Sequence, residues 1–292
     1  MNPYFLIILA ALLIEYSLEL LADLLNMKTL SSSLPKEFES IYTADTYKKS
    51  QSYTRTHTTF GIIESTCSLI ITLLFWLMGG FNYLDLIVRN WQLGIIFTGL
   101  VYIVILVLIR SIISLPFSVY STFVIEEKFD FNKTTPNIFI TDILKGILLS
   151  IVLGVPLLLG ILALFEYAGS FAWLYCWIAG SVFTLFIQFI APTWIMPLFN
   201  KFTPLESGEL RKAILAFAKS VNYSLQGVYM IDGSKRSSKS NAFFTGFGKN
   251  KRIALFDTLI QKHTVSELVA VLAHEIGHYK KKHIMQGIVI SI

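Results

Sequence analysis

Charged side chains are scarce in this 292-residue sequence. Asp, Glu, Lys and Arg together make up 15% of it, whereas 54% of the residues are hydrophobic and the mean hydropathy is +0.63. Soluble domains carry roughly 25% charged residues. The shortage argues against an ordinary soluble protein and favours a polytopic membrane protein.

Cysteine is nearly absent, and no cleavable leader is evident. Cys67 and Cys176 both lie inside apolar runs, which argues against a disulfide framework and against a thiolate metal cluster. No cationic segment precedes the first apolar run and no small-residue cleavage site follows it, so we expect this run to be retained as a helix. The net charge of +5 does not indicate nucleic-acid binding, because the basic residues are spread between long apolar runs.

Five apolar stretches are long enough to cross a bilayer, which takes about 20 helical residues. They cover approximately residues 4–25, 58–80, 93–123, 143–165 and 170–192. A sixth stretch begins at Ile284. We expect a mainly α, polytopic fold, with a transmembrane domain over residues 1–199 and a small α/β domain over residues 200–292 that runs into a truncated sixth transmembrane helix.

The loops between these stretches differ in their content of Lys and Arg. Residues 26–57 carry five, 81–92 one, 124–142 two and 166–169 none, while residues 200–283 carry fourteen. Because short cytoplasmic loops retain positive charge, the pattern predicts that the second domain is cytosolic and that the N-terminus is outside.

The polar region after residue 200 has the pattern of a small α/β domain. Residues 203–206 are typical of a capping box with Pro204 at the first helical position, and they predict a helix that runs to about Ser220. Residues 264–267 are a second capping box, which opens another helix. Between them, β-branched and aromatic residues predict short strands at residues 227–231, 242–247 and 252–256.

The helix expected after Thr264 contains the sequence H-E-I-G-H at residues 274–278. Its two histidines lie about 40° apart around a helix axis, so both imidazoles can bind one Zn²⁺ ion. Glu275 is placed to take a proton from a water molecule that the metal activates. The motif predicts a zinc metalloendopeptidase with His274 and His278 as metal ligands and Glu275 as the catalytic base. A chance match is the alternative, and the capped helix argues against it.

A catalytic zinc ion normally has three protein ligands. His283 is the only histidine beyond His278, and on a continuous helix it should face away, because it lies about 140° around the axis from His278. His57 and His263 are expected to be ordinary solvated or packed histidines. The residues therefore supply two ligands and a base, but no convincing third ligand.

Other segments are informative together with this motif. They are APTWIMPLFNKFTPL at residues 191–205, SKRSSKSNAFFTGFG at 234–248, IEEKF and NKTT within 125–135, and YKKSQSY at 47–53. In combination they resemble the integral-membrane CAAX prenyl proteases, zinc enzymes that remove the C-terminal tripeptide from prenylated proteins, and their bacterial relatives. One departure is Asp130, where the family usually has glycine.

The resemblance implies a seven-helix protein that encloses a water-filled chamber, with one zinc ion facing the chamber. It also implies that the third ligand is a glutamate on a later helix. No such position exists before residue 292, so the chain is expected to be truncated, and a catalytically incomplete membrane fragment is the alternative to an active enzyme. Asn241, Ala242 and Phe243 correspond to the family's strand beside the active site, where we expect a substrate peptide to add to the sheet edge.

The implied partners are a peptide or protein substrate, including prenylated proteins, and the lipid bilayer, but no nucleic acid. The implied location is the endoplasmic reticulum membrane in a eukaryote, where prenylated proteins are processed at their C-termini. In a bacterium it is the inner (plasma) membrane, where membrane proteins are cleaved. In both cases the catalytic domain is expected on the cytosolic side.

Two groups of charged residues allow alternatives. An acidic stripe in the first span either lines the chamber or pairs with a basic residue of a later span. The stripe consists of Glu15, Glu19 and Asp23, and the basic candidates are Arg110 and Lys145. A basic run at residues 235–239 is expected to be a solvated loop rather than a site for lipid head groups or a substrate carboxylate.

Overall fold

The computed structural model describes residues 2–31, 33–223, 225, 227–245, 252–283, 286–287 and 290. Within them, five helical segments are long and apolar enough to cross a membrane, namely Pro3–Thr29, Ala44–Leu77, Ile95–Lys128, Pro136–Tyr167 and Gly169–Phe199. The five expected spans are thus confirmed. The predicted sixth stretch lies largely outside the described residues. The chain divides into two compact units, Met1–Asp130 and Phe131–Ile292.

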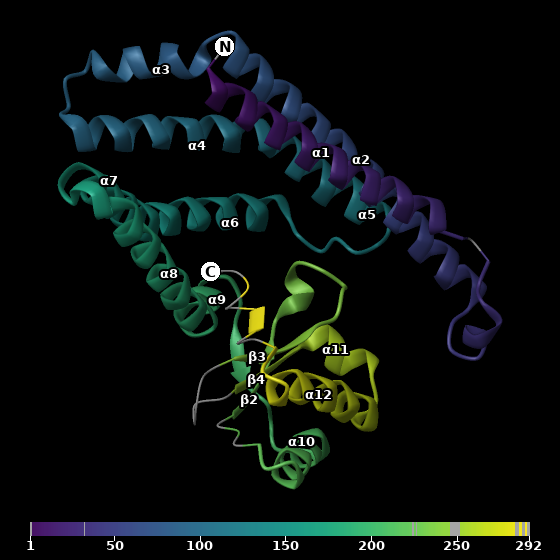
Figure 1. Ribbon diagram of the computed structural model, residues 1–292. Helices are drawn as coiled ribbons and strands as arrows, with labels where there is room; N and C mark the ends of the chain where they lie inside the picture. The colour runs from purple at the N-terminus through teal and green to yellow at the C-terminus, as the bar shows by residue number, and fades with distance from the viewer. Residues whose placement is uncertain are drawn as a thin grey trace. The chain divides into compact units, whose positions relative to one another are not determined.

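The described part of the first unit is helical. It contains α1 (Pro3–Thr29), η1 (Lys36–Phe38), α2 (Ala44–Leu77), α3 (Gly80–Arg89), α4 (Ile95–Tyr120), the π-helical turn η2 (Ser121–Ile125) and α5 (Glu126–Lys128). Helix α1 runs beside α2 (Figure 1), where the Tyr16 hydroxyl lies 2.7 Å from that of Thr66. The second span starts earlier than expected because the side chain of Thr43 caps α2 through the N–H of Thr46.

Helix α3 occupies a segment expected to be a loop. Gly79 has a φ of 78°, which lets the chain turn sharply after α2. Leu84 and Val88, four residues apart, are then buried and give α3 one apolar face. The short amphipathic helix was missed because a ten-residue segment is too short to show as a membrane span.

Asp130 ends the first unit in a left-handed conformation, with a φ of 62°. Glycine adopts this conformation without strain, which accounts for the glycine that the resemblance leads one to expect there. Asp tolerates it better than most residues, and Lys49 Nζ lies 2.6 Å from its Oδ2 atom. Beside it, Phe129 is buried with its ring edge-on to Tyr53.

The acidic stripe of α1 forms no ion pair with Arg110 among the residues that the structure describes. Lys145, the other candidate partner, donates a hydrogen bond of 2.7 Å to the carbonyl oxygen of Leu198. The interpretation of the stripe as a chamber wall stays a prediction.

The second unit begins with helices interrupted by two π-helical turns, η3 and η5, and by one 3-10 turn, η4. They are α6 (Pro136–Leu149), η3 (Ser150–Gly154), α7 (Val155–Tyr167), η4 (Gly169–Phe171), α8 (Ala172–Ile190), η5 (Ala191–Ile195) and α9 (Met196–Phe199). Pro156 and Pro197 each follow a π turn that contains the residue four positions earlier. Proline has no N–H to donate to the carbonyl of that earlier residue, and in an α-helix the proline ring clashes with the same carbonyl. The wider π turn relieves this clash.

A four-stranded sheet follows, with the strand order β1-β2-β4-β3. Strand β1 (Phe202–Pro204) is antiparallel to β2 (Gly227–Ile231), β2 is parallel to β4 (Arg252–Phe256), and β4 is antiparallel to β3 (Ala242–Thr245). The predicted strands at 227–231 and 252–256 are confirmed. The predicted third strand begins where expected, and its last two residues lie outside the described part.

The first predicted capping box is wrong. Residues 202–204 form β1, in which Thr203 pairs with Met230, and the helix α10 (Glu209–Ser220) starts only after Gly208. These residues form a strand because the chain leaves α9 next to β2. Hydrogen bonds between two strands outweigh a local preference for helix capping. The predicted helix end at Ser220 is confirmed.

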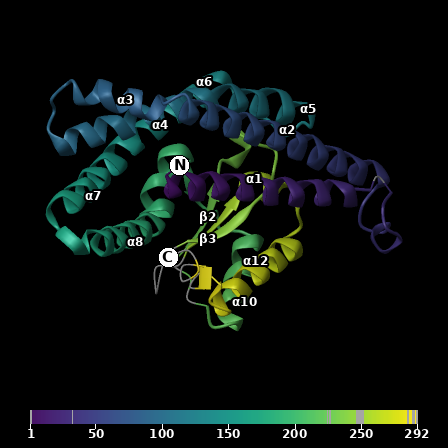
Figure 2. The same cartoon turned by 45° about the horizontal axis from the view of Figure 1, so that its top comes forward.

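Helices cover one face of the sheet. Figure 2 shows α10 and α12 (Val265–Lys280) together beside the strands, and α11 (Asp257–Lys262) joins β4 to α12. The core of this layer consists of Ile214, Val228, Ala242, Ile253, Leu255, Leu259, Leu268 and Leu272, all buried. Every strand except β1 contributes to it, so the sheet and α12 form one packed body.

Arg236 connects the sheet domain to the helices α6 and α9 of the same unit. Its Nε and Nη2 atoms lie 2.7 and 2.9 Å from the two carboxylate oxygens of Asp142 in α6. It also donates to Asn200 Oδ1 and to the carbonyl of Phe199 at the end of α9. The hydrogen bonds to Asp142 raise the pKa of the guanidinium above its ordinary value. The solvated loop expected at residues 235–239 is therefore wrong at Arg236.

We predict that Arg236→Ala lowers the free energy of unfolding by about 3 kcal/mol, the lower end of the range for breaking a buried ion pair. The lower end applies because the two side chains are still 23% and 25% exposed. Thermal unfolding in detergent measures the loss. Lys235→Ala, at the exposed neighbour, is the matched control, and equal melting of the two variants would contradict the prediction.

Candidate metal centre

Helix α12 begins with the capping box expected from the sequence. The Thr264 N–H donates to Glu267 Oε2 at 2.8 Å, and the Glu267 N–H donates to Thr264 Oγ1 at 3.4 Å. The hydrogen bond from the Thr264 N–H is the main cause that holds the pKa of Glu267 below its ordinary value. His263 Nδ1 lies 3.5 Å from the same carboxylate, so His263 belongs to the helix start.

An apolar stripe fixes the rotation of α12 about its axis. Leu268 and Leu272, each 1% exposed, pack in the sheet core, and Ile276 packs with Ala218 and Tyr223 at the C-terminal end of α10. The spacing of four residues places these side chains on one face. The opposite face carries His274 and His278, which are both exposed.

The two histidines converge. His274 Nε2 lies 3.0 Å from His278 Nε2, and the rings are tilted by 77° with their centroids 4.7 Å apart. Ligand nitrogens bind zinc at about 2.0–2.1 Å, so two of them around one ion lie about 3.3 Å apart at the tetrahedral angle. The donor set and its separation therefore fit one zinc ion held by both Nε2 atoms.

Glu275 lies between these two faces of the helix. Its side chain is half-buried, and the hydrogen bonds and ion pairs of the described residues do not include its carboxylate. A carboxylate that other described residues do not hold in a hydrogen bond or ion pair can accept a proton from a water molecule beside the histidine pair. The structure thus brings the His274 and His278 rings together and has Glu275 next to His274 on α12.

A third ligand is not found in the described part of the chain. No third His, Cys, Asp or Glu there forms a metal-binding group with His274 and His278. His283 does not face away, however, and that prediction is wrong. Its Nδ1 atom lies 2.8 Å from Nδ1 of His278, because α12 ends at Lys280 and Lys282 turns the chain with a φ of 57°.

Sequence reasoning missed this contact for a simple reason. Three consecutive lysines, 280–282, are compatible with a helix end, but they are equally compatible with a continued helix, since lysine is a good helix former. Only a glycine or an asparagine at position 282 would have indicated the left-handed turn.

The residues expected to bind substrate lie on an edge strand. Strand β3 has β4 as its only neighbour in the described sheet, and it lies against α12. Asn241 is exposed just before β3, and its Oδ1 accepts the N–H of Ala242. Ala242 turns its side chain into the core, and the half-buried Phe243 meets Phe256 edge to face.

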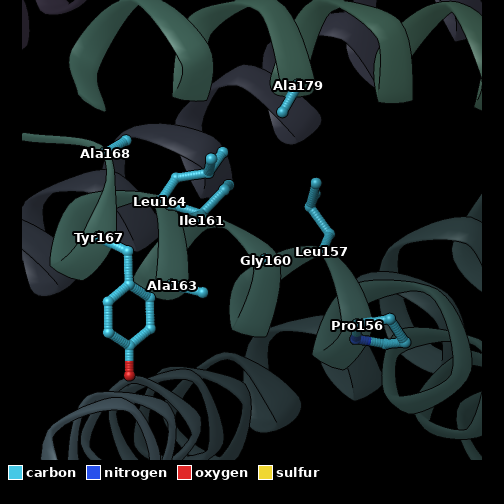
Figure 3. Close-up of a pocket in the computed structure, with 9 residues that line it drawn as sticks. All are labelled: Pro156, Leu157, Gly160, Ile161, Ala163, Leu164, Tyr167, Ala168 and Ala179. Atoms are coloured by element: carbon cyan, nitrogen blue, oxygen red, sulfur yellow. The ribbon is translucent and has the colours of Figure 1, made fainter. Parts of the chain in front are cut away.

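A hollow of about 570 Å³ lies elsewhere, between α7 and α8. Figure 3 shows Leu157, Ile161 and Leu164 of α7 facing Ala179 of α8 across it. Its lining contains no metal-binding or acid–base side chain apart from Tyr167, whose hydroxyl points away from the hollow. We therefore assign the candidate chemistry to α12 and β3.

Comparisons with known proteins identify the family. The model for the CAAX prenyl protease N-terminal region, which has five membrane helices, matches residues 23–201, and the model for peptidase family M48 matches residues 204–292. The chain belongs to peptidase family M48. The zinc motif, α12 and the sheet all fall in the M48 model, and the five spans fall largely in the other. This M48 chain is therefore an integral membrane protein.

Its M48 relatives include the probable CAAX prenyl protease 1 of Schizosaccharomyces pombe, which is 42% identical over 84% of this chain and 54% of that protein. CAAX prenyl protease 1 of Saccharomyces cerevisiae is 38% identical over 99% of this chain and 66% of that protein. A crystal structure of S. mikatae Ste24p matches with a TM-score of 0.92 at 37% identity, covering 100% of this chain and 69% of that one.

These M48 matches confirm the family resemblance and the fold class. The chain spans between about half and two thirds of the length of the two yeast relatives. The comparisons do not confirm the expected truncation. The predicted domain boundary at residues 199/200 stays a prediction, because the compact units divide after Asp130 while the two M48 family models meet between residues 201 and 204.

We predict that Glu267→Gln lowers the melting temperature at pH 7 and that the difference from the parent chain shrinks as the pH falls below 4.5, the ordinary pKa of this carboxyl. A carboxyl with a lowered pKa stabilises the fold above its unfolded-state pKa, and this contribution is lost as the pH falls through the folded-state pKa. Thermal unfolding at several pH values measures it. Glu206→Gln is the control, because Glu206 is exposed and belongs to residues 203–206, which form no helix cap. An equal effect of both variants would refute the capping role of Glu267.

Proposed function

We propose that this chain is a membrane zinc metalloendopeptidase in which His274 and His278 bind the zinc ion and Glu275 is the catalytic base. The convergence of the two Nε2 atoms to 3.0 Å is the observation that carries the proposal. The resemblance implies that the third ligand is a glutamate. No observation favours the alternative of a catalytically incomplete fragment.

The chemistry assigned to the residues follows from their positions. Zinc, when bound, polarises a water molecule and the substrate carbonyl. Glu275 takes a proton from the attacking water and returns it to the leaving amine. The His274 and His278 side chains stay on the open face of α12, where a peptide can approach, because Leu268 and Leu272 hold the opposite face in the core.

The open edge of β3 is the proposed binding site for the substrate backbone. The N–H of Phe256 donates to the carbonyl of Asn241, so in this antiparallel register the backbone groups of Asn241 and Phe243 face β4. Those of Ala242 and Phe244 face the open edge. A substrate strand would pair with these two residues and, to reach the Ala242 N–H, would replace Asn241 Oδ1 as its acceptor. Phe243 shapes the neighbouring surface.

The proposed substrates are the C-terminal segments of prenylated proteins. The support is the similarity to proteins named CAAX prenyl protease 1 in two yeasts and to homologues so named in plants and animals. Because these relatives are eukaryotic, we propose the endoplasmic reticulum membrane as the location. The basic loops support a cytosolic position for the catalytic domain.

We predict that the purified 292-residue chain contains close to one zinc ion per molecule and that His274→Ala and His278→Ala remove it. Glu275→Gln should keep the metal, since it removes a base rather than a ligand. In an assay on a prenylated peptide it should lower the rate by about 10²–10⁴-fold. Metal analysis and peptide cleavage measure the two effects.

His263→Ala is the control for these variants, because His263 lies just before α12, far along the helix axis from His274 and His278. The proposal fails if the parent chain holds no zinc, or if His263→Ala removes as much metal as His274→Ala.

Strand addition predicts an alternating pattern in the substrate. Methylating a substrate amide that donates to the sheet edge should weaken binding by about 5–10-fold, the worth of one hydrogen bond. Methylating the next amide, which points away from β3, should change little. A scan of singly N-methylated peptides, with binding measured on the Glu275→Gln variant, tests this. Equal effects along the whole peptide would exclude pairing with β3.

A further inference from the structure

His283, which follows the zinc motif, contacts the His278 ring on the side opposite His274. His283 Nδ1 lies 2.8 Å from His278 Nδ1, with the ring centroids 4.9 Å apart and the ring planes at 74°. His278 Nε2, on the other side of the same ring, faces His274. His278 is therefore held through both of its nitrogens, and each one has a different partner.

Zinc binding by His278 Nε2, as proposed above, determines where the hydrogen on the ring lies. An imidazole that binds a metal through Nε2 must present a lone pair there, so the neutral ring carries its hydrogen on Nδ1. The Nδ1–H group of His278 is then the donor at 2.8 Å, and Nδ1 of His283 is the acceptor. His283 in turn carries its own hydrogen on Nε2.

His283 is not itself placed as a zinc ligand. Its contact is with the ring nitrogen of His278 that points away from His274. The described residues contain no group of three potential ligands that includes it. Its position instead matches that of the outer partners which orient ligand histidines and fix their tautomer.

The chain reaches this position by an unusual turn. Helix α12 ends at Lys280, the N–H of Lys281 still donates to the carbonyl of Gly277, and Lys282 then has a φ of 57°. A continued helix would have carried His283 about 140° away from His278. The left-handed residue is disfavoured for lysine, and it places the imidazole against the ligand.

We propose that His283 is a positioning residue of the metal centre, which accepts the hydrogen bond from His278 Nδ1 and so holds His278 Nε2 toward the zinc ion. The inference rests on the proposed function of His274 and His278. It makes His283 part of the metal centre although it touches neither the metal nor the substrate.

The test is the zinc affinity of the full 292-residue chain at one fixed pH, measured by competition with a chromophoric chelator. His283→Leu removes the acceptor and should weaken zinc binding by about 10–100-fold, the usual effect of losing such a partner. His283→Asn should restore most of the affinity, because the Oδ1 atom of asparagine lies where histidine has Nδ1. His283→Gln places its oxygen one bond further out and should restore less.

Two controls separate a local effect from a general one. His263→Ala removes a histidine at the other end of α12 and should leave the zinc affinity unchanged. Lys282→Gly keeps the turn, since glycine adopts a positive φ without strain, and should also leave the zinc affinity unchanged.

The absorption spectrum of the cobalt-substituted chain reports directly on the ligand field, and it should change in His283→Leu but return toward the parent spectrum in His283→Asn.

The outcomes are distinguishable. Equal zinc affinity of the parent chain and His283→Leu overturns the role of His283, while the loss of zinc in His274→Ala would still support the proposed function. Equal losses in His283→Leu and His283→Asn also overturn it, since packing alone would then explain the effect. A parent chain that binds no zinc overturns both proposals.

Discussion

The candidate metal centre depends on the burial of one face of α12. Leu268, Leu272 and Ile276 are each at most 3% exposed, and replacing one such leucine by alanine typically costs about 2–5 kcal/mol. A rotation of α12 by one residue, about 100°, would bring these side chains into water. The packing of Leu268, Leu272 and Ile276 thus fixes the direction in which the two histidine side chains leave the helix.

Local signals predicted the parts of the structure in which neighbouring residues decide the outcome. The membrane helices followed from uninterrupted apolar runs, and the second capping box followed from Thr264 and Glu267, which do bond to each other. The convergence of His274 and His278 followed from helical spacing alone. In each case the partner lies within a few residues or the lipid supplies the environment, so the sequence contains the whole interaction.

The errors occur where a distant partner decides. Residues 203–206 have a sound capping pattern, yet Thr203 pairs with Met230, and no local rule includes that strand. Arg236 was taken for a solvated residue because Asp142 is 94 positions away. His283 was expected to face away because helical geometry was continued past Lys280, where the chain instead turns at Lys282.

The ion pair of Asp142 with Arg236 has a consequence for biogenesis. Asp142 belongs to a segment of membrane length, and a carboxylate there without a counter-ion is costly. Ribosomes make α6 long before Arg236, so until the polar domain has been synthesised and folded Asp142 has the charge of Lys145 on its own helix but lacks the two hydrogen bonds from Arg236. Lesions that delay folding of the sheet would therefore be felt by the membrane-insertion and quality-control machinery, even when they lie far from the lipid.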